Sequence, residues 1–200
     1  MPYERDVQAF SDRADGYEAG RLGQLHRDFA DRAIQVALTV APAPARVLDV
    51  GSGTGYAVWR LAAALPDAKQ LTGVDAAPGM VRVARAAGGG DDRVRFLEGI
   101  AEQLPLPDGS VDLVISTTSF DHWADQRAGL AECARVLGPG GHLVLSDLFS
   151  VLLAPTLLGS RGGKARTRGR ANRLLAAAGL RDPRWQRLAG PIVQTVVAAK

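Results

Sequence analysis

The stretch VLDVGSGTG, Val47 to Gly55, decides the fold of this chain of 200 residues. Arg46 to Val50 reads as a short apolar strand. The three glycines that follow it allow a tight turn and let a ligand approach the backbone without a Cβ clash. Residues 54–65 then read as a helix whose N-terminus points back at the turn. This strand, turn and helix predict a site for a nucleotide or nucleoside.

Strands and helices alternate on either side of this unit. Residues 1–20 are polar and predicted to be irregular, and residues 21–40 have helical spacing. Downstream, we expect helices at 79–87, 124–137 and 165–178, and strands at 70–74, 94–97, 111–116, 142–147, 185–188 and 192–198. The alternation predicts a doubly wound, Rossmann-like α/β fold with helices on both faces of a mostly parallel seven-stranded sheet. Gly190-Pro191 is too short for a helical crossover, so the C-terminal strand should be antiparallel to its neighbour.

Composition fits one globular domain over residues 1–200. Hydrophobic residues make up 46% and charged residues 22%, which argues against a disordered or fibrous chain. The single cysteine, Cys133, excludes an internal disulfide, and three histidines with one cysteine argue against a metal site. The longest apolar stretch, 148–158, is too short to span a membrane, and no secretory signal begins the chain. We therefore expect a cytoplasmic protein.

Charge is distributed unevenly along the chain. Residues 151–200 hold ten Lys/Arg and one acid, whereas residues 1–150 hold fourteen Lys/Arg and twenty acids. A basic end is typical of proteins that bind nucleic acid, an anionic membrane surface or an acidic substrate, but a solvated helix face is the simpler interpretation. No aromatic interleaving or RNA-binding motif accompanies the arginines, which argues against nucleic acid as a partner.

Asp49 indicates which nucleoside the glycine turn holds. A dinucleotide fingerprint would place a glycine where this chain has Tyr56. A carboxylate just before the glycines would also repel a pyrophosphate. S-adenosylmethionine carries a sulfonium and an ammonium, so charge favours that cofactor over NAD or FAD. Asp75, at the end of the next strand, can accept both hydroxyls of a ribose.

Four motifs in order, VLDVGSGTGY (47–56), GVDAAPGMVRVAR (73–85), EGIAEQLPLPDGSVDLVIS (98–116) and RVLGPGGHLVLSD (135–147), give the chain its resemblance to a known family. The chain resembles the class I S-adenosylmethionine-dependent methyltransferases, in particular the small bacterial group with the type 11 methyltransferase domain. The resemblance covers residues 10–147 well and the rest loosely.

The resemblance implies a set of cofactor-binding residues. Those at the methionine end are Asp49, Gly51, Gly53 and Ser116. Those at the ribose and adenine are Asp75, Ala76, Met80 and the backbone of Ala101. Phe10, Ala14 and Tyr17 match a segment that closes over the cofactor, so residues 1–40 are expected to act as a lid. Ile100 stands where the family usually has an acid for the adenine amino group, which leaves that contact to the backbone. Glu102 is expected either to order its loop or to contact the ligand.

Methyl transfer needs a general base only if the acceptor must lose a proton. His122 follows the fourth strand, where an open parallel sheet has its ligand crevice, and is one catalytic candidate. His26, in the helix of the expected lid, is another, and Asp121 is a third. Capping, packing or surface roles are the alternatives for these residues, and His142 is expected to be structural.

The expected function is methyl transfer to the oxygen, nitrogen or carbon of a small-molecule acceptor. The alternatives are an RNA methyltransferase that uses the basic C-terminal face and a regulatory protein that binds the cofactor without catalysis. The apolar connecting segment, 148–164, has three interpretations: packing over the sheet, a homodimer interface, or a pocket for an apolar substrate.

Overall fold

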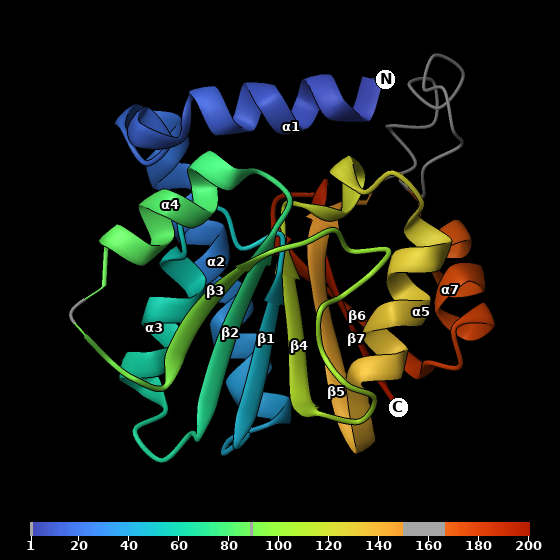
Figure 1. Cartoon of the computed structure of the whole chain (residues 1–200). Helices are drawn as coiled ribbons and strands as arrows, with labels where there is room; N and C mark the ends of the chain where they lie inside the picture. The colour runs from blue at the N-terminus through green and yellow to red at the C-terminus, as the bar shows by residue number, and fades with distance from the viewer. Residues whose placement is uncertain (1, 89, 150–166) are drawn as a thin grey trace.

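A computed structural model describes residues 2–88, 90–149 and 167–200 (Figure 1). Its strands form one seven-stranded sheet of order β3-β2-β1-β4-β5-β7-β6. Strands β1 to β5 run parallel, and β7 is antiparallel to both β5 and β6. The predicted fold, with its antiparallel C-terminal strand, is confirmed. The strands are β1 (Arg46–Val50), β2 (Gln70–Asp75), β3 (Val94–Glu98), β4 (Val111–Thr117), β5 (Leu137–Leu148), β6 (Arg181–Ala189) and β7 (Val193–Ala199).

Helices cover both faces of the sheet. One face packs against α2, α3 and α4, and the other packs against α5 and α7 (Figure 1). Each face buries its own apolar cluster, because successive side chains of a strand point to opposite faces of the sheet. The helices are α1 (Pro2–Asp12), η1 (Ala14–Gly16), α2 (Gly20–Val40), α3 (Tyr56–Ala64), α4 (Pro78–Ala86), η2 (Phe120–His122), α5 (Gln126–Val136) and α7 (Arg168–Ala177).

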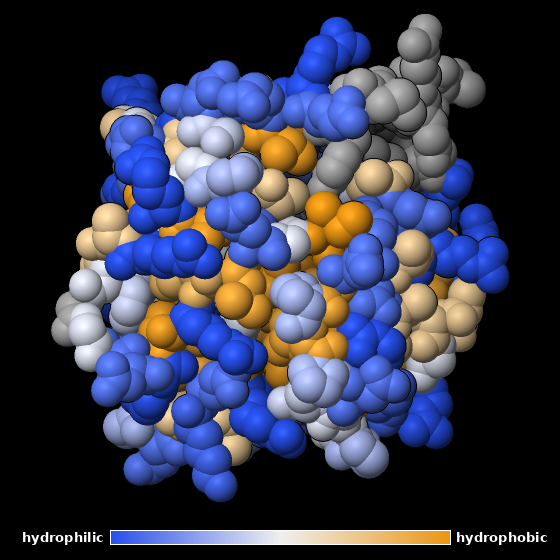
Figure 2. Space-filling model, in the orientation of Figure 1, coloured by the Kyte–Doolittle hydropathy of each residue, from blue (hydrophilic) through white to orange (hydrophobic). Residues whose placement is uncertain are grey.

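A loop, not a helix, joins β3 to β4 across the front of the sheet (Figure 1). Its Leu104 and Leu106 are buried against Leu48 and Val50 of β1 in the apolar cluster on that side. Figure 2 shows apolar side chains gathered near the centre of this face, with hydrophilic residues around them. This loop therefore closes the part of the core that α5 and α7 do not reach.

The glycine turn after β1 lies against two neighbouring elements. Gly55 has φ +84°, and a Cβ there would lie 2.6 Å from Cζ of Phe96 on β3. Gly51 has φ +76°, and its Cβ would lie 2.3 Å from the Cβ of Ser119, just after β4. Both positions therefore require glycine for conformation and for space. The turn lies where the carboxyl ends of the parallel strands β1, β2 and β4 meet at one edge of the sheet.

The structure corrects three sequence predictions. Residues 1–20 are not irregular, because α1 and η1 form there. Leu137 begins β5 rather than ending a helix, since it pairs with Val111 of β4 before a bulge. The edge strand β6 is longer than predicted and contains Pro183. This proline lies between Arg181 and Arg184, where the pairing with β7 is irregular, and an edge strand tolerates proline at such a position.

Much of the predicted connecting segment lies outside the described residues. Leu148 ends β5 and Phe149 is buried, but residues 150–164 fall in the gap between residues 149 and 167, so the three interpretations of that segment stay predictions. Within the described ranges, no helix is long and apolar enough to cross a membrane. The same part of the chain contains no cluster of three or more His, Cys, Asp or Glu side chains placed to hold a metal ion.

Candidate active site

A cleft lies above the carboxyl ends of the central strands, beneath the N-terminal helix. It measures about 1080 Å³ including its open mouth, and it is lined by residues of α1, α2, the glycine turn and the loops after β2, β3 and β4. A volume of this order accommodates a nucleoside cofactor together with a small second molecule. It lies where open parallel sheets bind their ligands.

Backbone hydrogen bonds hold the glycine turn to the end of β2. The N–H groups of Gly51 and Ser52 donate to the Val74 carbonyl at 2.8 and 3.1 Å. Asp75 accepts from the N–H of Gly53 at 2.8 Å and from that of Ala77 at 2.9 Å. Each carboxylate oxygen keeps a further lone pair, so Asp75 can still accept hydroxyl groups from a ligand in the cleft. Burial raises the pKa of Asp75, although these two hydrogen bonds act in the opposite sense.

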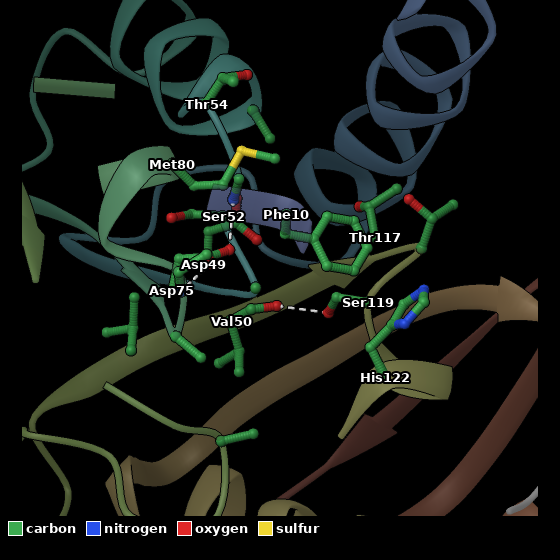
Figure 3. A pocket seen from close by; sticks show the side chains of 18 of the residues that line it. Phe10, Asp49, Val50, Ser52, Thr54, Asp75, Met80, Thr117, Ser119 and His122 are labelled. Atoms are coloured by element: carbon green, nitrogen blue, oxygen red, sulfur yellow. Dashed lines mark hydrogen bonds between the residues drawn. The ribbon is translucent and has the colours of Figure 1, made fainter. Parts of the chain in front are cut away.

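Asp49 is a buried acid that faces the cleft. Its residue exposure is 3%, yet it belongs to the cleft lining. Figure 3 shows it beside Asp75, and burial, with a smaller contribution from the charge of Asp75, raises the pKa of Asp49 to about 8. At neutral pH Asp49 is therefore mainly protonated, and a cation placed beside it would favour ionisation.

We expect Asp49→Asn to raise the free energy of unfolding at pH 8. The pKa of Asp49 in the folded protein lies above its unfolded value, so unfolding releases a proton and stability falls as the pH rises from about 4 towards 8. Asparagine removes this loss, and the gain should be about 2 kcal/mol at pH 8, less than the full shift because water relaxes the penalty beside a cleft.

Urea denaturation at pH 5 and pH 8 measures this effect, and the gain should shrink at the lower pH. Asp112→Asn is the matched control. Arg46 donates to Asp112 at 2.7 Å and lowers its pKa, so the control should lose stability at pH 8 instead. A variant at position 49 that is less stable than wild type at pH 8 would contradict the prediction.

The N-terminal segment forms a roof over the cleft. Phe10, Ala14 and Tyr17 pack with Met80 of α4 in a small apolar cluster. The roof is tied to α4 where Ser11 accepts from the N–H of Gly79 at 2.8 Å, so close that a Cβ at Gly79 would lie 2.3 Å from the Ser11 carbonyl oxygen. The predicted lid residues Phe10 and Tyr17 both line the cleft.

Glu18 links the roof to the glycine turn, a connection that the sequence did not reveal. Its carboxylate accepts a short hydrogen bond from the Thr54 hydroxyl and a second bond from Arg27 of α2 at 3.0 Å. Arg27 also donates to the Glu18 carbonyl at 2.7 Å. All three residues line the cleft, so one ion pair fixes the roof, α2 and the turn around it.

The two histidine candidates both line the cleft and both contact rings of the roof. His122 meets Phe10 edge-on, with ring centroids 4.9 Å apart, and His26 stacks on Tyr17 at 5.2 Å. His122 lies on η2, whose Asp121 N–H donates to the buried Asp147 carboxylate at 3.2 Å. Burial lowers the pKa of His26, so this imidazole is neutral at pH 7.

Unpartnered polar atoms gather at this cleft. In the part of the chain that the structure describes, four buried side-chain atoms lack a hydrogen-bond partner, and all four belong to residues that line the cleft. They are His26 Nδ1, Ser52 Oγ, Glu102 Oε2 and Thr117 Oγ1. Buried polar groups are rarely left unsatisfied, so these atoms indicate contacts made by a ligand.

The predicted cofactor residues fall into two groups. Those that line the cleft are Tyr17, Asp49, Gly51, Gly53, Asp75, Ala76, Met80 and Ala101. Ser116 does not line it: its residue is fully buried, and its hydroxyl lies 2.7 Å from that of Ser119. Ser119 gives its only hydrogen to the Val50 carbonyl, so Ser116 donates to Ser119, which does line the cleft.

Glu102 orders its loop, and its contact with a ligand stays a prediction. One carboxylate oxygen accepts from the N–H of Asp125 at 2.8 Å and so orders the loop. The other is the unpartnered Oε2 described above. Ile100, two residues earlier, is partly exposed and is not part of the cleft lining.

Comparison with known proteins gives a consistent result. Residues 48–145 match a family model described as a methyltransferase domain. A malonyl-[acyl-carrier protein] O-methyltransferase of Methylococcus capsulatus is 38% identical over 73% of this chain and 52% of its own length. A demethylmenaquinone methyltransferase of Thermus thermophilus is 40% identical over 69% of this chain and 63% of its own. The chain thus spans between half and two thirds of these relatives.

The fold comparison covers more of the chain. A solved complex between the Haloferax volcanii Trm112 methyltransferase activator and a methyltransferase matches with a TM-score of 0.79, covering 96% of each chain at 23% identity. At that identity the match concerns the fold alone. It extends to the N-terminal roof and the C-terminal strands, which the family model does not reach.

Proposed function

Because this chain belongs to the class I S-adenosylmethionine-dependent methyltransferases, we propose that it transfers a methyl group from that cofactor to a small-molecule acceptor. The observation that carries the proposal is the buried carboxylate of Asp49 facing the cleft. An acid held there without a cation is costly, and a sulfonium with an ammonium supplies the missing positive charge.

The residues of the cleft fit the cofactor in charge and in hydrogen bonding. Asp49 would hold the cationic end, and Arg27, the one arginine among the described lining residues, would face its carboxylate. Asp75 would accept the ribose hydroxyls, with Met80 and Ala101 against the adenine. Ser52 Oγ, which has no partner in the described chain, gains one from such a ligand. When bound, the cofactor supplies an electrophilic methyl group on a positively charged sulfur.

His26 is our proposed general base for an acceptor that must lose a proton. Its Nδ1 is buried without a partner among the described residues, and its ring is neutral because burial lowers its pKa. The stack with Tyr17 fixes the plane of the ring. His122, the other histidine candidate, lies against Phe10 and also lines the cleft.

A small acceptor agrees better with the cleft than an RNA substrate does. The arginines of α7 and β6 form the basic part of the described C-terminal region, and none of them lines the cleft. The acidic side chains of the described cleft lining outnumber its single arginine, and such a surface would repel a phosphate backbone. The two curated relatives act on malonyl-[acyl-carrier protein] and demethylmenaquinone, which leaves the acceptor to be identified.

Calorimetry with S-adenosylhomocysteine and NAD tests the cofactor assignment. We expect S-adenosylhomocysteine to bind and NAD not to bind. Asp75→Ala should weaken the binding of S-adenosylhomocysteine about tenfold, because two hydroxyl groups of the ligand lose a charged acceptor. Asp67→Ala, in the exposed turn before β2, is the control and should bind as wild type does. Binding of NAD with S-adenosylhomocysteine ignored would overturn the proposal.

A further inference from the structure

The two sides of the cleft differ in chemistry. Figure 3 shows Asp49 and Asp75 on one side, and Phe10, Thr117 and His122 on the other. The first side holds the residues assigned above to the cofactor. The second side, at the end of β4 and under the roof, is therefore the place for the methyl acceptor, and its lining restricts what that acceptor can be.

Two buried polar atoms of the cleft lining are available to an acceptor. Thr117 Oγ1 and His26 Nδ1 are both buried without a partner in the described chain. A neutral imidazole accepts a hydrogen bond at Nδ1 when its hydrogen is on Nε2, and a threonine hydroxyl both donates and accepts. A ligand with an O–H or N–H group can donate to His26 Nδ1, and such a group can also pair with the Thr117 hydroxyl. An ionised carboxylate has no hydrogen to give to His26.

Aromatic side chains also line this part of the cleft. Phe10 covers it from the roof, and Trp123, which is buried, lies behind η2. The Trp123 indole N–H is already bonded to Ser119 at 3.3 Å, so its ring contributes an apolar surface. Flat apolar molecules pack well against such rings.

The charge of the cleft disfavours anions. Its described ionisable lining, apart from its histidine and tyrosine side chains, consists of Asp6, Glu18, Asp49, Asp75, Glu102 and Arg27. Glu18 already balances Arg27 at 3.0 Å. Arg13 lies 3.9 Å from the centroid of the Phe10 ring but is not part of the lining. The cofactor balances at most the charge of Asp49, so acids remain in excess and the field opposes a further negative charge.

We infer that the methyl acceptor is an uncharged, flat and largely apolar molecule that carries a hydroxyl or amino group, and that carboxylates are excluded. The inference rests on the proposed function and names the substrate class of the same site. The acceptor oxygen or nitrogen bonds to the methyl carbon as the bond from that carbon to sulfur breaks. Sulfur keeps the electron pair, and the acceptor's proton passes to His26 Nδ1.

A matched pair of probes tests the inference: 2-naphthol, neutral at pH 7, and 2-naphthoate, its carboxylate counterpart. Calorimetry first establishes saturation of the protein with S-adenosylhomocysteine, and each probe is then titrated into that complex. We expect 2-naphthol to bind at least about tenfold more tightly than 2-naphthoate. Raising the salt concentration should narrow this difference, because salt screens the acidic lining.

Two threonine variants locate the binding site. Thr117→Val removes the unpartnered hydroxyl. It should weaken the binding of 2-naphthol about fivefold without changing the affinity for S-adenosylhomocysteine. Thr39→Val is the control, because Thr39 is exposed near the end of α2 and donates to the Gln35 carbonyl at 2.9 Å. This control should bind both ligands as wild type does.

The outcomes separate the inference from the function on which it rests. If S-adenosylhomocysteine fails to bind, the proposed function fails and the inference fails with it. If S-adenosylhomocysteine binds but 2-naphthoate binds as tightly as 2-naphthol, the substrate class is wrong. Failure of both probes to bind the saturated complex overturns it as well.

Discussion

Raising the pH from 6 to 8 should tighten the binding of S-adenosylmethionine about fiftyfold, because Asp49 must lose a proton to pair with the cation. Burial raises the pKa of Asp49 to about 8 in the empty cleft. Below that pH the protonated carboxyl has to ionise on binding, so each unit of decrease in pH weakens affinity by close to tenfold. The effect ends at a pH low enough to keep Asp49 protonated in the complex as well.

Calorimetry in two buffers of different ionisation enthalpy measures the effect directly. About one proton should be released for each cofactor bound at pH 6.5. Asp49→Asn should release none at this site, and its affinity should vary little between pH 6 and pH 8. The cofactor affinities of wild type and variant should become similar at pH 6, where wild-type Asp49 is itself neutral before binding. An unchanged pH profile in the variant would assign the titration to another group.

The same carboxylate connects stability with binding. In the empty protein the ionised form of Asp49 is disfavoured by burial, so the folded state is less stable at pH 8 than an asparagine variant would be. The cofactor reverses this by supplying a cation. A buried carboxyl that ionises in the free protein only at a cost is thus the feature that favours a cationic ligand over a neutral one of similar shape.

The fold could be predicted because its strongest signals are local. The glycine turn after β1 is encoded by positive-φ glycines such as Gly51 and Gly55, and Pro42 and Pro66 mark element boundaries. Helix α1 was missed because its apolar side chains, such as Val7 and Phe10, are sparse, and much of the helix is exposed. They pack on the small apolar cluster around Met80, and Phe10 also contacts His122. Local periodicity does not report a helix that is stabilised by one narrow contact.

The candidate site was predicted unevenly for a related reason. Asp49 and Asp75 follow from strand ends, which parallel sheets bring together. The bridge from Glu18 to Thr54 and Arg27 joins segments up to 36 residues apart, and no pattern in the sequence links them. Ser116 shows the converse limit: its position at the end of β4 suggested a ligand contact, but the side chain faces Ser119 instead.

Replacing His26 with asparagine should lower the rate of methyl transfer to 2-naphthol about a hundredfold, the usual contribution of a positioned general base. Asparagine approximates the shape of the ring near Nδ1 but cannot take up a proton. Binding of S-adenosylhomocysteine should stay within about twofold of wild type, because no cofactor contact is assigned to this residue. Single-turnover transfer of a radiolabelled methyl group separates the chemical step from product release.

Two further histidine variants make this result specific. His142 lies on β5 away from the cleft lining, so His142→Asn should keep the wild-type rate. His122→Asn should lose far less activity than His26→Asn, and the reverse order would make His122 the base. The pH profile with saturating cofactor offers a separate check. Burial lowers the pKa of His26, so the wild-type rate under these conditions should fall only below the ordinary histidine range, and the His26 variant should lack that limb. Such a limb arises because only the neutral imidazole can accept the acceptor's proton.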